Sequence, residues 1–332
     1  MKIKYLPLQA HCFAYGGFDI QMLSTSNAIN DLNVVIEKMD IWNRDAEFDI
    51  LHCWGLGLSH SESYHWAKRS GKKLVATILM HDTESFYDKF RFKISSLLYK
   101  QRMITELLRM PDKIVVVNEM QADFCNLCYK VPSKKIHVIP NVIGDVFFER
   151  SLKVSEQPKE QYILTVGNIC QRKNQIALAQ ACIAGNFKLV IVGKVMDGEN
   201  VVGAELAQLV NDNKDILSWI PELKENSEEL VDYYQNCLLF ALPSHVEQQP
   251  ISMLEAAVLQ KPILTADRRY ARQKYYQNAK LVNPSLVGSI KDGIDDILRS
   301  PLKYTTDKNV LLECRSKNIG ESYKRLYSEL LT

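Results

Sequence analysis

Two series of short apolar segments constrain the fold of this 332-residue chain more than any other feature. Each series alternates with helix-like segments, which is the rhythm of βαβ units and parallel sheets. The segments are nearly continuous apolar runs, as strands covered by helices on both faces must be. The first series comprises residues 3–8, 49–53, 74–79, 113–118 and 136–140, and the second comprises residues 162–167, 188–193, 216–220, 238–243, 262–265 and 280–282. The sequence therefore predicts an α/β protein with two Rossmann-like, doubly wound domains of parallel sheet.

A polar stretch separates the two series and sets the expected domain boundaries. Residues 151–160 are rich in Ser, Lys, Glu and Gln and contain a Pro, so we expect an interdomain linker there. The first domain then spans residues 1–150 and the second residues 161–308, and each is long enough for its own core. Residues 309–332 follow a helical pattern with an apolar stripe, and we expect this helix to pack back on the first domain.

Composition excludes several classes of function. The formal net charge of +2 argues against a dedicated nucleic-acid binder, which usually has a strong basic bias. The chain opens without the apolar stretch of a signal peptide, and no later run approaches the roughly 18 apolar residues of a membrane span. We therefore expect a cytoplasmic protein. Its eight cysteines lie mostly in apolar runs and are expected to be free thiols, and the lone C-x-x-C of Cys125 and Cys128 predicts no zinc site.

The most informative segment spans residues 242–257. An apolar run ends at Ser244, a polar loop follows, and Pro250 suits the first turn of a helix because its missing N–H costs nothing there. The helix N-terminus would then offer the unpaired backbone amides of Ile251, Ser252 and Met253, together with its positive dipole end, to a phosphate.

Two carboxylates flank this helix start. Glu247 lies in the loop and Glu255, eight positions later, lies more than one turn into the helix. Such a pair can accept hydrogen bonds from the hydroxyls of a ribose and of a sugar beyond the pyrophosphate. On spacing alone, a solvated glutamate on a helix surface is an equally good interpretation.

The order of residues in this segment resembles a known family. The run P-S-x-x-E-x-x-P-x-S-x-L-E-A at residues 243–256 is similar to the E-x7-E motif of the retaining family-4 glycosyltransferases of the GT-B fold. The sequence Q-K-P-I-L at residues 260–264 resembles the G-K-P-V-I that ends the motif. The resemblance implies a fold in which two Rossmann-like domains face a central cleft.

A second similarity lies in the loop after the first strand of the second domain. The sequence T-V-G-N-I-C-Q-R-K-N-Q at residues 165–175 resembles the family's V-G-R-x-x-x-x-K-N, whose Arg and Lys neutralise the leaving pyrophosphate. Lys173 matches the Lys, but Asn168, after Gly167, occupies the position of the Arg. An amide cannot grip a pyrophosphate in the bidentate manner of a guanidinium, so Arg172 is the candidate to replace it.

Weaker similarities occur in the first domain. Residues 14–20, which include Gly17, resemble the family's glycine-rich loop near the donor phosphate and the acceptor. Residues 78–82 resemble its T-x-H-D, which implies that His81 lies near the donor sugar or the acceptor. Residues 138–145 resemble its V-I-P-N-G-V-D, with Val142 where glycine is usual.

The resemblance implies a reaction. A sugar would pass from UDP or GDP to a hydroxyl of a glycan or a lipid-linked saccharide, with retention at the anomeric carbon, in the synthesis of cell-surface polysaccharide. No metal or other cofactor is expected, because the second domain offers no D-x-D after a strand. The implied catalytic residues are His81, Lys173 and Glu247, and the implied donor-binding residues are Gly17, Gly167, Asn168, Arg172, Lys173, Ile251, Ser252, Met253 and Glu255.

Three other functions are compatible with parts of this pattern. A sugar-nucleotide 2-epimerase uses the same pair of domains. A non-catalytic sugar-nucleotide-binding subunit is suggested by the missing Arg and by Gln248 and Gln249, which replace the family's usual Gly-Phe. A nicotinamide dehydrogenase ranks last, because no G-x-G-x-x-G follows a strand.

One further segment has two interpretations. Residues 88–110 interleave Lys and Arg with Phe, Tyr, Ile and Leu. The segment fits either a solvated helix with an ordinary apolar stripe or a helix that contacts an anionic membrane surface, as in family members with lipid-linked acceptors. The second interpretation would make the protein peripheral on the inner face of the membrane.

Overall fold

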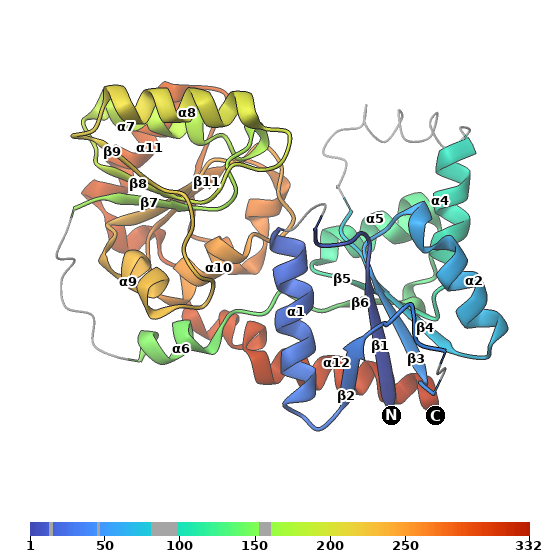
Figure 1. The fold of residues 1–332 in the computed structure, drawn as a ribbon. Coiled ribbons are helices and arrows are strands. Elements are labelled where there is room, and N and C mark those ends of the chain that lie inside the picture. The colour runs from blue at the N-terminus through green and yellow to red at the C-terminus, as the bar shows by residue number, and fades with distance from the viewer. Residues whose placement is uncertain (13–15, 45–46, 81–98, 153–160) are drawn as a thin grey trace. The chain divides into compact units, whose positions relative to one another are not determined.

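The chain forms two compact units, each built on a parallel sheet (Figure 1). The computed structural model describes residues 1–12, 16–44, 47–80, 99–152 and 161–332. The first unit comprises Met1–Val142 and Ser316–Thr332, and the second comprises Ile143–Arg315. The cleft expected between the two units stays a prediction.

The sheet of the first unit has the strand order β2-β1-β3-β4-β5-β6, with every pairing parallel. Helices cover both of its faces, and separate apolar clusters form under α1 and α12 and under α2, α4 and α5. The strands are β1 (Lys2–Pro7), β2 (Val35–Lys38), β3 (Ile50–Trp54), β4 (Lys73–Thr77), β5 (Lys113–Val116) and β6 (Ile136–Val138). The helices are α1 (Gly17–Asn30), α2 (Ser61–Arg69), α4 (Tyr99–Arg109), α5 (Glu119–Tyr129) and α12 (Ser316–Leu331), with short 3₁₀ turns η1 (Leu58–His60) and η2 (Ser133–Lys135).

The last helix, α12, packs on the first unit although it follows the second along the chain. Its Gly320 crosses α1 so closely that a Cβ atom there would lie 2.4 Å from the carbonyl oxygen of Ala28. Tyr327 shares a hydrogen bond of 2.7 Å with Nδ1 of the fully buried His52 on β3. The helix thus closes one face of the first sheet through close backbone contact and a buried polar contact.

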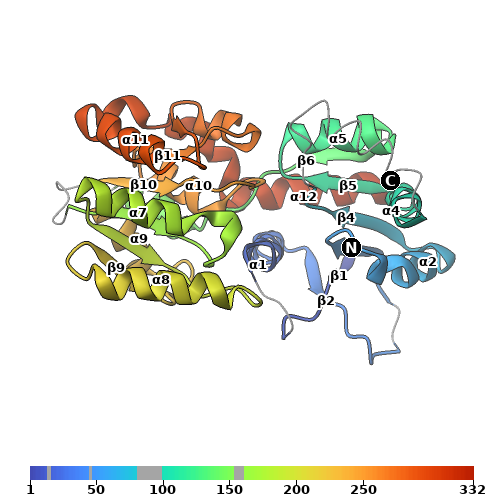
Figure 2. The same ribbon diagram turned by 90° about the horizontal axis from the view of Figure 1, so that it is seen from above.

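The sheet of the second unit has the strand order β12-β11-β10-β7-β8-β9, again with every pairing parallel. Figures 1 and 2 show α7, α8 and α11 on one face and α9 and α10 on the other. The strands are β7 (Ile163–Val166), β8 (Leu189–Val192), β9 (Leu217–Ile220), β10 (Leu239–Leu242), β11 (Ile263–Ala266) and β12 (Lys280–Val282). The helices are α6 (Asp145–Ser151), α7 (Gln175–Gly185), α8 (Asn200–Asp212), α9 (Glu228–Asn236), α10 (Ile251–Val258) and α11 (Val287–Arg299), with 3₁₀ turns η3 (Gln171–Lys173), η4 (Arg269–Arg272), η5 (Lys274–Tyr276), η6 (Pro301–Tyr304) and η7 (Lys308–Cys314).

The strand order of the second unit defines where a ligand can enter. From β7 the chain moves outward through β8 to β9, and it then returns to place β10 on the other side of β7. The loops that leave the carboxyl ends of β7 and β10 therefore diverge to opposite faces and open a crevice at this switch point, which is the usual ligand site of such sheets.

Three details differ from the sequence-based expectations. The short edge strand β2, with only Ile36 buried, is too brief and too exposed to stand out as an apolar run. Residues 143–150 belong to the second unit and not to the first, because Phe147 and Phe148 of α6 enter the apolar core beneath α9 and α10. The last helix begins at Ser316 and not at residue 309, since Leu311 and Cys314 are buried in the second unit. Most of the expected linker, residues 153–160, lies outside the described residues.

Candidate functional site

The loop after β7 passes very close to the neighbouring strand β8. Gly167 has a φ of +146° and Gly193, at the end of β8, has a φ of +149°. A Cβ atom on Gly193 would lie 2.1 Å from the carbonyl oxygen of Gly167, so only glycine fits there. The side chain of Lys173 lies over Gly167, since a Cβ atom on that glycine would lie 2.8 Å from the lysine Nζ. Lys173 is therefore held directly above the carboxyl end of β7.

Two cations from η3 converge on the loop after β10. Arg172 Nη1 lies 2.8 Å and Lys173 Nζ lies 3.1 Å from the same oxygen, Oε1 of Glu247. Arg172 also donates to the carbonyl of Val246 at 2.7 Å, and its own carbonyl accepts from the amide of His245 at 2.9 Å. These contacts join the loops of β7 and β10 across the switch point. The three charged groups carry one net positive charge, which suits an anionic ligand.

The ionisation of Glu247 follows from these neighbours. Burial alone would raise the pKa of its carboxyl, but the charges and hydrogen bonds of Lys173 and Arg172 outweigh this and lower the pKa below the ordinary value. Glu247 is therefore an anion at neutral pH.

Asn174 links the backbone segments that lie next to this cluster. It adopts a left-handed conformation with φ of +62°, and its side-chain amide donates to the carbonyls of Pro243 at 3.2 Å and Pro284 at 2.7 Å. The carboxyl ends of β7, β10 and β12 are thereby linked. Asn168, which occupies the family's Arg position, is half-buried next to Gly167, and its carbonyl accepts from the side chain of Gln175 at 3.0 Å.

Helix α10 begins beside the cluster, as the sequence predicts, but its amides are not equivalent. The amide of Met253 donates to the carbonyl of Pro250 at 3.1 Å, and its side chain is fully buried and accepts from Thr265. The Met253 amide thus has a partner within the first turn, and its expected contact with the donor stays a prediction. The half-exposed Ile251 and Ser252 stay candidates for binding a phosphate.

Glu255 lies on the inner side of α10 and has a different environment from Glu247. It is 8% exposed, and its Oε2 accepts a 2.7 Å hydrogen bond from the hydroxyl of Tyr234 on α9. Burial raises the pKa of Glu255 to about 7; it outweighs the lowering by the Tyr234 hydrogen bond, and Glu225 adds a smaller upward contribution. Sequence reasoning selects Glu255 but misses Tyr234, since an aromatic residue in an amphipathic helix reads as ordinary core.

Two of the expected site residues, Gly17 and His81, belong to the first domain. Gly17 is exposed and begins α1 near the carboxyl end of β1, where the amide of Gly16 donates to Asp19 at 2.9 Å. No heavy atom of the described residues lies within 4 Å of a Cβ atom on Gly17, so a side chain there would project into open space. His81 lies outside the described residues.

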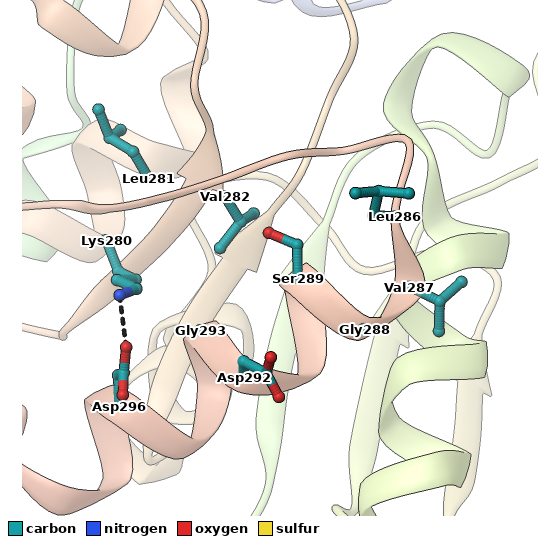
Figure 3. A pocket seen from close by; sticks show the side chains of 10 residues that line it. All are labelled: Lys280, Leu281, Val282, Leu286, Val287, Gly288, Ser289, Asp292, Gly293 and Asp296. Atoms are coloured by element: carbon teal, nitrogen blue, oxygen red, sulfur yellow. Dashed lines mark hydrogen bonds and ion pairs between the residues drawn. The ribbon is translucent and has the colours of Figure 1, made fainter.

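A surface hollow of about 560 Å³ lies elsewhere in the second unit, between β12 and α11. Figure 3 shows Lys280 and Asp296 paired across it, with Asp292 and Ser289 on the same helix. None of the residues expected to bind the donor lines it. Because an anionic ligand would meet two carboxylates there, the hollow is a poor site for a phosphate.

Within residues 1–12, 16–44, 47–80, 99–152 and 161–332, no group of three or more His, Cys, Asp and Glu side chains is arranged to hold a metal ion. Over the same ranges, no helix is both long and apolar enough to cross a membrane.

Comparison with known proteins gives concordant results for the two units. The family model described as "Glycosyl transferases group 1" matches residues 147–309, and that described as "Glycosyltransferase Family 4" matches residues 29–144. A search of the curated proteins found no match.

Solved structures show the fold. HepE of Anabaena in complex with UDP and glucose is 13% identical, with a TM-score of 0.72 over 99% of both chains. Sucrose-phosphate synthase of Thermosynechococcus elongatus is 15% identical, with a TM-score of 0.71 over 100% of this chain and 99% of that one. A glycosyltransferase of Rickettsia africae is 13% identical, with a TM-score of 0.69 over 99% of this chain and 98% of that one. The chain thus has the GT-B fold and belongs to glycosyltransferase family 4.

Proposed function

We propose that this glycosyltransferase moves a sugar from a UDP- or GDP-linked donor to a hydroxyl of a glycan or of a lipid-linked saccharide, with retention at the anomeric carbon, in cell-surface polysaccharide synthesis. The observation that carries the proposal is the cluster of Arg172, Lys173 and Glu247 at the switch point of the second sheet, beside the start of α10. The HepE structure contains UDP and glucose on the same fold, which favours a nucleotide-sugar donor.

The reaction breaks the bond between the sugar's anomeric carbon and the diphosphate, forms a bond from that carbon to the acceptor oxygen, and passes the acceptor proton to the leaving phosphate. In our proposal Lys173 and Arg172 stabilise the charge that develops on the diphosphate, together with the amides of Ile251 and Ser252. Arg172 takes the part of the family's Arg, and Asn168 and Gly167 line the approach of the phosphate. This scheme requires no metal ion or other cofactor.

The remaining roles are positional. Glu247 orients the two cations and binds the donor sugar, and Glu255 binds the ribose. His81 and Gly17 are proposed to lie near the donor sugar and the phosphate on the first domain's side.

Calorimetric titration without metal tests the donor site. We expect one of UDP and GDP to bind, and Glu255→Ala to weaken that binding by about tenfold or more, as for the loss of a hydrogen bond to a charged group. ADP and NAD serve as comparison ligands. Exclusive binding of NAD, or no binding of any of the four, would overturn the proposal.

Product analysis separates transfer from its alternatives. Incubation with the matching nucleotide-sugar and a saccharide acceptor should yield a glycoside whose anomeric configuration, read by NMR, equals that of the donor. An epimerised nucleotide-sugar would instead show a 2-epimerase, and binding without any turnover would show a non-catalytic subunit.

A basic and aromatic surface of the first unit supports peripheral membrane contact as part of the proposal. Helices α2 and α4 lie side by side in both views (Figures 1 and 2). Trp66 on α2 is 55% exposed and Tyr99 on α4 is 77% exposed, and Arg69 lies 5.5 Å from the Trp66 ring. Exposed basic side chains beside aromatic rings match the requirements of an anionic lipid surface.

Vesicle co-sedimentation tests this contact. The variant Arg69→Glu/Arg102→Glu should lose binding to vesicles that contain anionic lipid, whereas Lys188→Glu/Lys214→Glu, on the second unit, should bind like the wild type. The residues of the expected segment 88–110 that precede Tyr99 lie outside the described residues. Equal binding by both variants would contradict a membrane role for this surface.

A further inference from the structure

The contact between Tyr234 and Glu255 is unusual in its degree of burial. Tyr234 is fully buried, Glu255 is 8% exposed, and the tyrosine oxygen lies 2.7 Å from Glu255 Oε2. A carboxylate taken this far out of water is costly unless it is paired with a cation or hydrogen-bonded. Tyr234 supplies the hydrogen bond here.

Aromatic contacts fix the ring of Tyr234 and therefore the position of its hydroxyl oxygen. It stacks on Phe240 of β10, with ring centroids 5.5 Å apart, and meets the edge of Phe147 of α6 at 5.6 Å. The end of α9 is fixed as well, because the buried Lys261 donates to the carbonyls of Gln235 at 2.6 Å and Cys237 at 3.0 Å. The hydroxyl therefore cannot swing away without disturbing the core.

The direction of the hydrogen bond is determined by chemistry. Burial, and then the Glu255 carboxylate, raise the pKa of Tyr234 well above its ordinary value, so the hydroxyl keeps its proton and donates it to Glu255. A carboxylate has two acceptor oxygens. With Oε2 engaged by Tyr234, Oε1 is the oxygen left to accept from a ligand.

We propose that Tyr234 is a positioning residue, which fixes the Glu255 carboxylate so that it accepts hydrogen bonds from the ribose hydroxyls of the nucleotide-sugar. This inference rests on the proposed function and names a residue outside the family motifs. Tyr234 acts through Glu255 and does not itself contact the ligand.

The proposal predicts a change in pH dependence. The pKa of Glu255 is raised to about 7 by burial, lowered by the Tyr234 bond and raised by Glu225. Besides Glu255, the polar groups that affect the pKa of Tyr234 are Cys237 and Ser252. Removing the Tyr234 hydroxyl removes the hydrogen bond that lowers the pKa of Glu255, so the carboxylate form needed for ribose binding would appear only at higher pH.

Titrations of UDP and GDP between about pH 6 and pH 9 test this with three proteins. Tyr234→Phe keeps the ring and should bind about tenfold more weakly at pH 7, with affinity recovering toward that of the wild type as the pH rises. Tyr233→Phe removes a hydroxyl from the preceding residue of the same helix and should match the wild type throughout. A purely structural role for Tyr234 would weaken binding equally at every pH.

A double-mutant cycle with Glu255→Gln gives a second measurement. If Tyr234 acts through Glu255, Tyr234→Phe has no additional effect on affinity in the Glu255→Gln background. Should Tyr234→Phe fail to fold, the carboxyl ¹³C resonance of Glu255 in the wild-type protein still tests whether Glu255 contacts the nucleotide. It should titrate near pH 7 in the free protein and at lower pH with UDP or GDP bound.

The outcomes separate the inference from the proposed function. If the wild type binds a nucleoside diphosphate, and Tyr234→Phe binds it with the same affinity and pH dependence, the inference is wrong and the proposed function stands. If the wild type binds neither UDP nor GDP at any pH, the proposed function is wrong.

Discussion

Glu247 and Glu255 have opposite ionisation behaviour although they lie eight positions apart on one loop and helix. Glu247 is paired with Lys173 and Arg172, which lower its pKa despite burial. Glu255 has only a neutral hydroxyl as its hydrogen-bond donor among the described residues, and burial raises its pKa. The first is a permanent anion that organises cations, whereas the second gains and loses a proton near neutral pH.

The role of Lys173 can be tested by substitution. Lys173→Ala removes a charge held 3.1 Å from Glu247 and above Gly167, and we expect kcat for sugar transfer to fall by roughly 100-fold to 1,000-fold, as for other groups that stabilise charge in a transition state. Lys173→Arg should recover part of this loss. Lys188→Ala, an exposed lysine before β8, is the matched control and should retain full activity. An unchanged kcat in Lys173→Ala would exclude a catalytic role.

At the scale of residues, the sequence indicates which side chains share a site only where those side chains lie in motifs of the family. The structure places Arg172 and Lys173 against Glu247, and the roles of these residues in the donor site stay predictions. The bond from the Met253 amide to the carbonyl of Pro250 is not visible in the sequence, because it depends on the local backbone conformation of the first turn of α10. Tyr234 is missed for a similar reason, since its contact with Glu255 arises only when α9 and α10 pack together.

His52 should make the first unit sensitive to acid. Its ring nitrogens bond to Tyr327 at 2.7 Å and Thr77 at 2.8 Å, and burial lowers its pKa to about 3 from an ordinary 6.5. The neutral ring stabilises the fold fully above pH 6.5, and this contribution is lost as the pH falls toward 3, at about 1.4 kcal/mol per pH unit. Urea unfolding followed by tryptophan fluorescence should show this slope.

Two variants isolate the effect of His52. His52→Phe should be less stable at neutral pH but should show a shallower loss of stability in acid, because the titrating group is gone. His65→Asn, at an exposed position of α2, should keep the slope of the wild type. Equal slopes in all three proteins would contradict the prediction.

At the scale of elements, the predictable features are those with strong local patterns. Strands buried on both faces are long apolar runs, and Pro250 marks the start of α10, so these appear in the sequence. The edge strand β2 lacks such a pattern. The start of α12 is also hidden, because the apolar stripe of residues 309–331 continues across Arg315, although the residues before and after it pack on different units.

The crossing of α12 over α1 predicts an unusual response to alanine. In most helix interiors Gly→Ala stabilises by about 1 kcal/mol. In Gly320→Ala, however, the Cβ atom would lie 2.4 Å from the carbonyl oxygen of Ala28, so we expect a net loss of about 1–3 kcal/mol as the helices move apart. Gly288→Ala in α11, where no described atom lies within 4 Å of the Cβ, should be neutral or stabilising. Thermal unfolding of both variants measures the difference, and a stabilised Gly320→Ala would show that the helices are not in close contact.

At the scale of the whole molecule, each unit has the attributes of a separate folding domain. Each sheet has apolar clusters on both faces, made by residues of its own unit. The chain passes between the units twice, after Val142 and after Arg315, and a parallel bridge between Ile143 and Arg315 brings the two crossings together. The boundaries of the two units depend on which apolar core α6 and η7 pack into. The polarity of the chain alone does not show which core that is.

This organisation predicts that a donor ligand stabilises one unit selectively. Arg172, Lys173, Glu247 and Glu255 all belong to the second unit, so a nucleoside diphosphate at 100 times its Kd should add about 2.7 kcal/mol to that unit. In scanning calorimetry of the full chain, the midpoint of one transition should therefore rise by roughly 5–10 °C, while the other stays in place. Gly320→Ala should lower the unresponsive transition, because α12 belongs to the first unit. The prediction would be contradicted if the ligand raised the transition that Gly320→Ala lowers, or if it raised both transitions equally. Either result would mean that ligand binding also stabilises the first unit.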